Sequence, residues 1–452
     1  MATMAVMNGT VVTGDGATII EAGSVIIEGD RIQEVIHGPR EAKEFSGIDR
    51  IIDASKCIIM PGVINHHTHG IAMCPLYPSA AEPLNRDRVK YNLDKHLVEG
   101  TTTLLNVCGF ASMEEVEESN RNHPINIKTA TSHSPTNFQA AKLADGSGLK
   151  EKHLALTVEK MLENGAVAIG EIGAGHTLGG GGQDYLYIPQ AIKQETGRLL
   201  STPQARKLKY SILGRKIDCS AFNEDNVKTV LDELDLSTHL TVQRARELVE
   251  NSVMSSFNAA LDGMREAAKL GAMLKVPVLV HNAAASMHVV EEVCRSEAHI
   301  LADHSNHPTF EVEECVEHAR KIKALGKTVD VSSLDMFVAR EMCDSPEIIH
   351  ALMRAKVVDT ISTDYGGGLW DSILLVIESV VEEGIVDLAA AIAMTSSNVC
   401  TALPLLAPER GLIKKGKMAD ITMVNLQKIS HVEAVIIEGK VVVKGGKPVY
   451  SN

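Results

Sequence analysis

The chain has 452 residues, of which 44% are hydrophobic and 23% are charged, values typical of globular proteins. A domain usually takes about 100–200 residues, and α/β barrels reach about 250, so this length predicts two or three domains. The formal net charge of −14 disfavours binding to phosphate backbones. An aromatic content of 3% also disfavours stacking on single-stranded nucleic acid.

The cysteines predict the redox compartment. Eight of them are scattered along the chain without a CxxC pair, which is typical of reduced thiols. The first residues carry no basic segment followed by an apolar run, and no apolar stretch reaches roughly 18 residues. We therefore expect a cytoplasmic protein with a small-molecule substrate and with neither a membrane nor a nucleic acid as partner.

Both ends of the chain read as short β-strands. Turns built on Gly next to Asp or Asn separate apolar runs, and GSVIIEGDRI near the start resembles EAVIIEGKVV near the end. Each end is too short to form a core alone. We expect residues 1–58 and 411–452 to form one small β-sandwich, with two independent β decorations as the alternative.

The middle of the chain, residues 59–410, alternates apolar runs with amphipathic segments. This alternation predicts a (β/α)8 TIM-like barrel, an α/β fold. Residues 183–260 are too long for one connection and contain the helical patterns 202–213 and 241–252, so we expect a helical insertion there. The eight expected strands fall within residues 57–67, 101–107, 125–133, 166–173, 276–281, 299–305, 328–333 and 358–364.

Metal-type side chains fall at the ends of these strands, where barrel enzymes place their functional groups. In a strand, residues i and i+2 point to the same side, so an HxH at a strand end aims both rings at one point. A catalytic ion needs about three protein ligands, and six therefore predict two ions bridged by a carboxylate. The six are His67, His69, Glu171, His281, His304 and Asp364.

These residues predict hydrolytic chemistry. Zn²⁺ suits the donors, with Fe²⁺ and Mn²⁺ as alternatives, and such ions lower the pKa of bound water towards about 7. We expect a hydroxide that bridges the two ions to attack the substrate, with Asp364 as general base and then acid. Taken singly, each residue has a plainer interpretation. Glu171 could be a surface charge, His281 or His304 could be a hydrogen-bonded core histidine, and Asp364 could cap a helix. Their joint placement at strand ends favours the metal centre.

The segment PGVINHHTH after a β-rich start resembles the amidohydrolase superfamily, as do NVCTALPLL, GLIKKGKMADITMVN and VIIEGKVVVKGG near the end. The resemblance covers nearly the whole chain except residues 183–260. It implies a metal-dependent hydrolase barrel with a split β-sandwich, in which the six residues above are the ligands. It also implies a homo-oligomer.

Two positions narrow the resemblance. Many binuclear members have a carbamylated Lys on strand four, where this chain has Glu171. Mononuclear aminohydrolases carry a Glu three residues after the strand-five His, where this chain has Ala284. The chain is therefore most similar to enamidase-like and imidazolonepropionase-like members, which cleave C–N bonds in rings.

The resemblance implies hydrolysis of a cyclic amide of the lactam or enamide type. Alternatives are a binuclear deaminase of a purine-like heterocycle, an N-acyl deacetylase and a non-catalytic scaffold. We also expect His133 and His176 to face the substrate and His66 to be a packing residue. His307 is the rival of His304 as ligand, and Trp370 lines the pocket or packs in the core.

Overall fold

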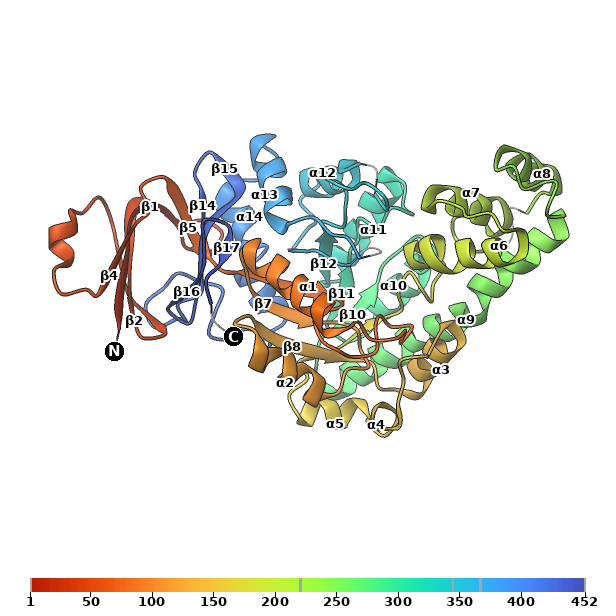
Figure 1. Ribbon diagram of the computed structural model, residues 1–452, viewed down its shortest axis with the longest axis horizontal. Helices are drawn as coiled ribbons and strands as arrows, with labels where there is room; N and C mark the ends of the chain where they lie inside the picture. The colour runs from red at the N-terminus through yellow and green to blue at the C-terminus, as the bar shows by residue number, and fades with distance from the viewer. Residues whose placement is uncertain (1, 219–221, 344, 366–367, 451–452) are drawn as a thin grey trace.

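The computed structural model describes residues 2–218, 222–343, 345–365 and 368–450. Eight parallel strands follow one another in chain order around a barrel (Figure 1). Thr363 Oγ1 accepts a 2.8 Å hydrogen bond from the Asn65 side chain, which draws the end of the last strand to the first. The strands are β6 (Val63–Thr68), β7 (Thr101–Asn106), β8 (Asn126–Thr131), β9 (Ala168–Ile172), β10 (Val278–His281), β11 (Ile300–Asp303), β12 (Thr328–Ser332) and β13 (Thr360–Ser362).

Helices surround this barrel, and polar side chains set where several of them begin. The Asn85 side chain accepts the Arg88 N–H at the start of α1, and the Thr241 hydroxyl accepts the Arg244 N–H at the start of α9. No helix in the described ranges is long and apolar enough to cross a bilayer. The helices are α1 (Arg86–Val98), α2 (Met113–Asn122), α3 (Pro135–Ala144), α4 (Glu151–Leu154), α5 (Val158–Glu163), η2 (Gln183–Tyr187), α6 (Ile188–Thr196), α7 (Thr202–Leu213), α8 (Glu224–Glu233), α9 (Val242–Leu274), α10 (Met287–Cys294), α11 (Val312–Ala324), α12 (Glu347–Arg354), α13 (Ile373–Glu382), α14 (Leu388–Ala393) and α15 (Ser397–Ala402).

The two chain ends share a second, mixed sheet and form a β-sandwich beside the barrel (Figure 1). Antiparallel pairing of Ile59 with Met423 joins them, and both residues lie in a common core with Val6 and Ile436. The prediction of one joint β-sandwich is confirmed. Its elements are β1 (Thr3–Val12), β2 (Ile19–Glu28), β3 (Arg31–Ile36), η1 (Ala42–Phe45), β4 (Arg50–Asp53), β5 (Cys57–Pro61), β14 (Ile421–Asn425), β15 (Lys428–Ile437), β16 (Lys440–Lys444) and β17 (Lys447–Pro448).

The first expected barrel strand, residues 57–67, is two strands. Its first half is β5, which pairs in the sandwich, and its second half is β6, which opens the barrel. Gly62 stands between them, and a Cβ there would collide with the Thr102 side chain. One apolar run therefore crosses from one sheet to the other at a residue that has no side chain.

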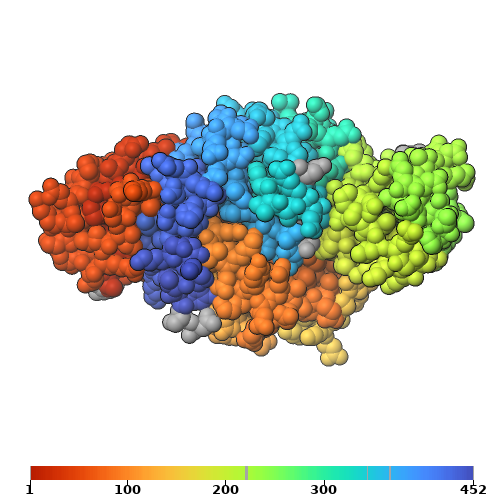
Figure 2. Space-filling model, turned by 45° about the horizontal axis from the view of Figure 1, so that its top comes forward, coloured from red at the N-terminus to blue at the C-terminus, as the bar shows by residue number. Residues whose placement is uncertain are grey.

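The long segment after β9 forms a lobe at the end of the molecule opposite the β-sandwich (Figure 2). The pattern at 202–213 is α7, as the sequence predicts. The pattern at 241–252 is the first part of α9, a continuous helix of 33 residues. The same helix continues through the amphipathic segment that precedes β10. The lobe is thus built directly onto a helix that packs on the barrel.

Candidate metal centre and active site

The six expected ligands converge at the carboxyl ends of the barrel strands. His67 lies near the end of β6, Glu171 lies in β9 and His281 ends β10. His69 and His304 directly follow β6 and β11, and Asp364 lies two residues after β13. The five residues His67, His69, Glu171, His281 and His304 are less than 5% exposed. The parallel strands bring residues nearly three hundred positions apart to one rim, because all their carboxyl ends meet at the same edge.

Glu171 stands at the centre of the cluster, and its two oxygens face different pairs of imidazoles. Oε1 lies 2.9 Å from His281 Nδ1 and 3.1 Å from His304 Nε2. Oε2 lies 3.3 Å from His69 Nε2 and 3.6 Å from His67 Nε2. One carboxylate oxygen for each imidazole pair is the arrangement that a carboxylate bridge between two cations requires.

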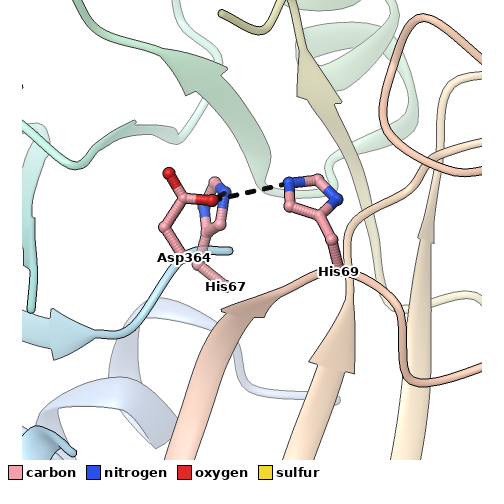
Figure 3. Close-up of side chains that lie close together, drawn as sticks. All are labelled: His67, His69 and Asp364. Carbon is pink, nitrogen blue, oxygen red and sulfur yellow. Dashed lines mark ion pairs between the residues drawn. The ribbon is translucent and has the colours of Figure 1, made fainter. Parts of the chain in front are cut away.

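Asp364 faces the second of these pairs, His67 and His69 (Figure 3). Its Oδ1 lies 3.8 Å from the Nε2 atoms of both His67 and His69. Asp364 and His304 have positive φ angles of 61° and 34°, a left-handed backbone that costs energy outside glycine. Both side chains therefore depend on the surrounding structure to hold them at the site.

The charges of the cluster favour ionised carboxylates. Burial alone raises the pKa of Glu171, but His67, His281 and His304 outweigh it and hold the pKa well below its ordinary value. Burial likewise opposes ionisation of Asp364, yet the neighbouring imidazoles lower its pKa. Burial lowers the pKa of His281, and His304 lowers it further. Two ionised carboxylates among imidazoles form a donor set for a borderline cation.

Among the described residues, three groups have metal-ligating atoms close enough to one another to hold an ion. Two of them belong to this cluster: His67 with His69 and Asp364, and His67 with Glu171 and His304. His67 Nε2 is buried and has no hydrogen-bond partner among the described residues, although it points at both carboxylates. A buried nitrogen without a partner is costly, so the residues fit a metal ion at this position.

The third group lies behind the site and contains residues that the sequence analysis missed. Asp303 Oδ2 lies 3.1 Å from His67 Nδ1, on the side of the ring that faces away from Glu171. Asp330 lies 3.3 Å from His66 Nε2 and accepts hydrogen bonds from Ser362 and Thr360. An acid behind a ligand histidine fixes its ring and tautomer. The sequence signal that could have revealed Asp303 is ADHS at 302–305, where an acid directly precedes the strand-six histidine.

A cavity of about 50 Å³ opens onto the cluster. His176, an expected substrate residue, lines it and stacks on Tyr77 with ring centroids 4.2 Å apart. The Tyr185 hydroxyl links these two rings, 3.0 Å from His176 Nε2 and 3.1 Å from the Tyr77 hydroxyl. Burial lowers the pKa of His176 to about 3. These rings form an aromatic side of the cavity that the sequence did not reveal.

The glycine run Gly179–Gly182, which we call the glycine wall, lies beside the His176 ring, and its residues Gly181 and Gly182 line the cavity. A Cβ at Gly182 would overlap the His176 ring, and one at Gly181 would meet the terminal methyl of Met342. Lys209 of α7 donates a hydrogen bond to Gly179 O, and its Nζ lies 2.6 Å from Asp184 Oδ1. The buried pair Lys209–Asp184 thus fastens the lobe to the wall of the cavity.

Two expected pocket residues lie elsewhere. His133 packs against Phe110 and Phe138, with ring centroids 5.6 and 5.7 Å away, and is not among the residues that line the cavity. Trp370 stacks on His96 of α1 at 4.4 Å, and its indole N–H donates to Glu99. Both rings are therefore held in packing contacts. His307 lines the cavity, outside the metal-type groups.

Solved structures share this architecture over the whole chain. L-hydantoinase (dihydropyrimidinase) from Arthrobacter aurescens has a TM-score of 0.59 at 12% identity and covers 100% of this chain and 98% of its own. D-aminoacylase, described with a binuclear metal centre, has a TM-score of 0.58 at 12% identity, with coverage of 99% and 98%. Beta-aspartyl dipeptidase from Fervidobacterium islandicum AW-1 has a TM-score of 0.55 at 15% identity, with coverage of 100% and 99%.

No family model and no curated protein matches the sequence. At these identities the structural likeness establishes the fold: a TIM-like barrel with a β-sandwich built from both chain ends.

Proposed function

We propose that this protein is a binuclear metal-dependent hydrolase that opens a C–N bond in an uncharged cyclic amide. The observation that carries the proposal is the Glu171 carboxylate, which offers one oxygen to His281 and His304 and the other to His67 and His69. The resemblance of PGVINHHTH to the amidohydrolase superfamily supports it. The fold shared with a hydantoinase and with a D-aminoacylase described as binuclear also supports it.

The donor set would divide between two cations. His67, His69 and Asp364 would hold one, His281 and His304 would hold the other, and Glu171 would bridge them. Zn²⁺ is the proposed metal because imidazole and carboxylate suit it. When bound, such ions acidify water and polarise a carbonyl oxygen.

Asp364 is the proposed proton carrier. It lines the cavity and lies beside His67 and His69, which would hold one of the two cations. The neighbouring imidazoles lower the pKa of its carboxyl, so it is ionised at neutral pH and can accept a proton from the attacking water. It can then return that proton to the ring nitrogen as the C–N bond breaks.

The cavity favours an uncharged substrate. Among the described residues that line it, none is Lys or Arg, and the wall combines Tyr77, Tyr365 and Leu334 with imidazoles. Arg206 and Lys209 lie behind the glycine wall, and both are paired with Asp184. The described cavity wall would therefore offer a substrate carboxylate no Lys or Arg to pair with, and only the metal ions that the reaction uses would oppose its charge. We therefore favour a small neutral ring over an N-acyl amino acid or a dipeptide.

Three measurements test the proposal. Protein purified without chelator should contain about two equivalents of transition metal, and less than about one would count against it. Metal-loaded protein should hydrolyse members of a panel of lactams, hydantoins, dihydropyrimidines and enamides. Release of ammonia without ring opening would indicate a deaminase instead. In Asp364→Asn, turnover should be lost while metal is retained; near-normal turnover would refute the assigned role.

A further inference from the structure

His307 lines the cavity next to the proposed metal ligands, and the proposed function gives it no role. The ring is 5% exposed, and its centroid lies 5.3 Å from that of His281 and 5.6 Å from that of His304. It follows β11 in the turn that Pro308 and Thr309 continue. Because His281 and His307 line the same cavity, a ligand that contacts His281 lies close to the His307 ring.

Thr309 fixes the tautomer of this ring. The Thr309 backbone N–H donates to His307 Nδ1 at 3.2 Å, and an atom that accepts an N–H carries no proton of its own. Thr309 Oγ1 also lies 2.8 Å from Nδ1, and it accepts the Ala284 N–H at 3.1 Å, so its hydroxyl proton is free to point at Nδ1. Because Nδ1 is unprotonated, the neutral ring carries its proton on Nε2.

Nε2 lies on the side of the ring that faces the glycine wall. A Cβ at Gly180 would lie 3.2 Å from it, so the missing side chain keeps this side of the ring uncovered. Nε2 has no hydrogen-bond partner within the described part of the chain. His67 Nε2 is fully buried, whereas His307 Nε2 is not among the fully buried atoms, and His307 lines the cavity. An N–H donor at the wall of a ligand cavity is available to an acceptor in the ligand.

We propose that the Nε2–H group of His307 is a hydrogen-bonding subsite for a carbonyl oxygen of an uncharged cyclic substrate. The subsite rests on the proposed function for the identity of the substrate. An N–H donor matches a neutral carbonyl, and the apolar neighbours Leu334 and Pro308 strengthen the bond by keeping the local dielectric low. The same tautomer excludes His307 as a metal ligand through Nε2, because the lone pair that a cation needs is occupied by the proton.

Two matched variants test the subsite. The amide nitrogen of Gln can replace Nε2, whereas the shorter Asn reaches only the position of Nδ1. We expect His307→Asn to lower kcat/KM by about 100-fold or more, as loss of a positioned donor does, and His307→Gln to stay within about tenfold of the unaltered protein. The metal content should be unchanged in both. Loss of metal from both variants would make His307 a ligand, and full activity of H307N would leave it without a role; either result overturns the proposal.

A spectroscopic measurement tests the same subsite without turnover. In protein labelled with ¹⁵N-histidine, the signals that vanish in H307N should report a protonated Nε2 and a bare Nδ1. Hydantoin or dihydrouracil should shift the Nε2–H signal. A protonated Nδ1, or no shift with a ring that the protein hydrolyses, overturns the subsite. If no cyclic amide is hydrolysed, the proposed function fails, while the tautomer and the shift with hydantoin still decide the subsite.

Discussion

The strand-end cluster and the glycine wall border one cavity, and they are built by opposite means. The cluster, formed by His67, His69, Glu171, His281, His304 and Asp364, joins two carboxylates to four imidazoles. Regular parallel strands or the residues directly after them place every member. The glycine wall has no side chain of its own, and a buried ion pair from a distant helix holds it.

This difference separates two tasks within one site. Strand pairing fixes the cluster as part of the barrel itself, so that under the proposed function a change there acts on metal binding and bond cleavage. Tertiary contacts with the lobe fix the wall, so that a change there acts on what enters the cavity. Substitutions on the two sides should therefore differ in one readout above all, the metal content of the purified protein.

The largest effect should follow from Glu171→Gln. The amide cannot bridge two cations, and it leaves the imidazoles on one side without their anionic partner. We expect loss of at least one metal equivalent and a fall in turnover of about 1,000-fold or more. Metal analysis and the rate with the best ring substrate measure both. Glu159→Gln, on the exposed face of α5, is the control. A fully metallated and active E171Q would remove the basis of the cluster.

Asp184→Asn should give the next largest effect, on stability. Asp184 and Lys209 are both fully buried, and the substitution leaves the Lys209 ammonium and Arg206 without their counter-charge. Breaking a buried pair costs about 3–5 kcal/mol in the free energy of unfolding. Denaturant unfolding should show this loss while metal content stays unchanged. The double variant D184N/K209M should recover part of it, and equal instability of the two variants would show that the unpaired Lys209 ammonium is not the cause of the loss.

The sequence predicted the cluster because its signals are local. An HxH at the end of an apolar run, and Glu171 within AVAIGEIG, place polar groups where only a site explains them. The barrel and the joint sandwich followed from alternation and from similar turns at the two ends. The split of residues 57–67 at Gly62 was missed, because an apolar run does not show which sheet each half joins.

The glycine wall could not be predicted from its letters. GGGG at 179–182 shows that side chains are absent, but it does not show that the space is filled by the rings of His176, just before the run, and of His307, far from it in the chain. The Lys209–Asp184 pair joins α7 to the wall, and neither residue has a pattern that points to the other. Asp303 was overlooked for the same reason, since its partner His67 lies on another strand.

Gly182→Ala tests whether a change in the glycine wall lowers activity without changing the metal content of the cluster. The backbone at Gly182 has φ −61°, which alanine adopts readily, so the new methyl acts only by overlapping the rigid His176 ring. We expect kcat/KM to fall by about 10- to 100-fold with unchanged metal content, since small displacements of positioned groups are costly. In the control Gly181→Ala, the methyl meets only the flexible end of Met342, and the effect should stay within about threefold. Loss of metal in G182A would show that wall and cluster are not separate.

Glu115→Gln should give the smallest effect and serve as a reference outside both regions. Burial opposes ionisation of Glu115, but His153, Lys152 and the Ser112 N–H outweigh it and lower the pKa of its carboxyl to about 2. Because this folded-state pKa lies below the unfolded value near 4.5, the ionised group stabilises the fold above that value. The contribution is lost as the pH falls from about 4.5 through about 2.

One pKa unit corresponds to about 1.4 kcal/mol, and solvent screening of this partly exposed carboxylate reduces the total. The parent protein should therefore exceed E115Q in free energy of unfolding by about 2 kcal/mol at pH 7, and this difference should shrink steadily below pH 4.5. Urea unfolding of both proteins at pH 7 and at pH 3 measures it, and taking the difference at each pH cancels the titration of the cluster. Glu114→Gln, one residue away and exposed, should show no such trend. A difference between parent and E115Q that is the same at both pH values would mean that packing, rather than the charge of Glu115, stabilises this part of the barrel.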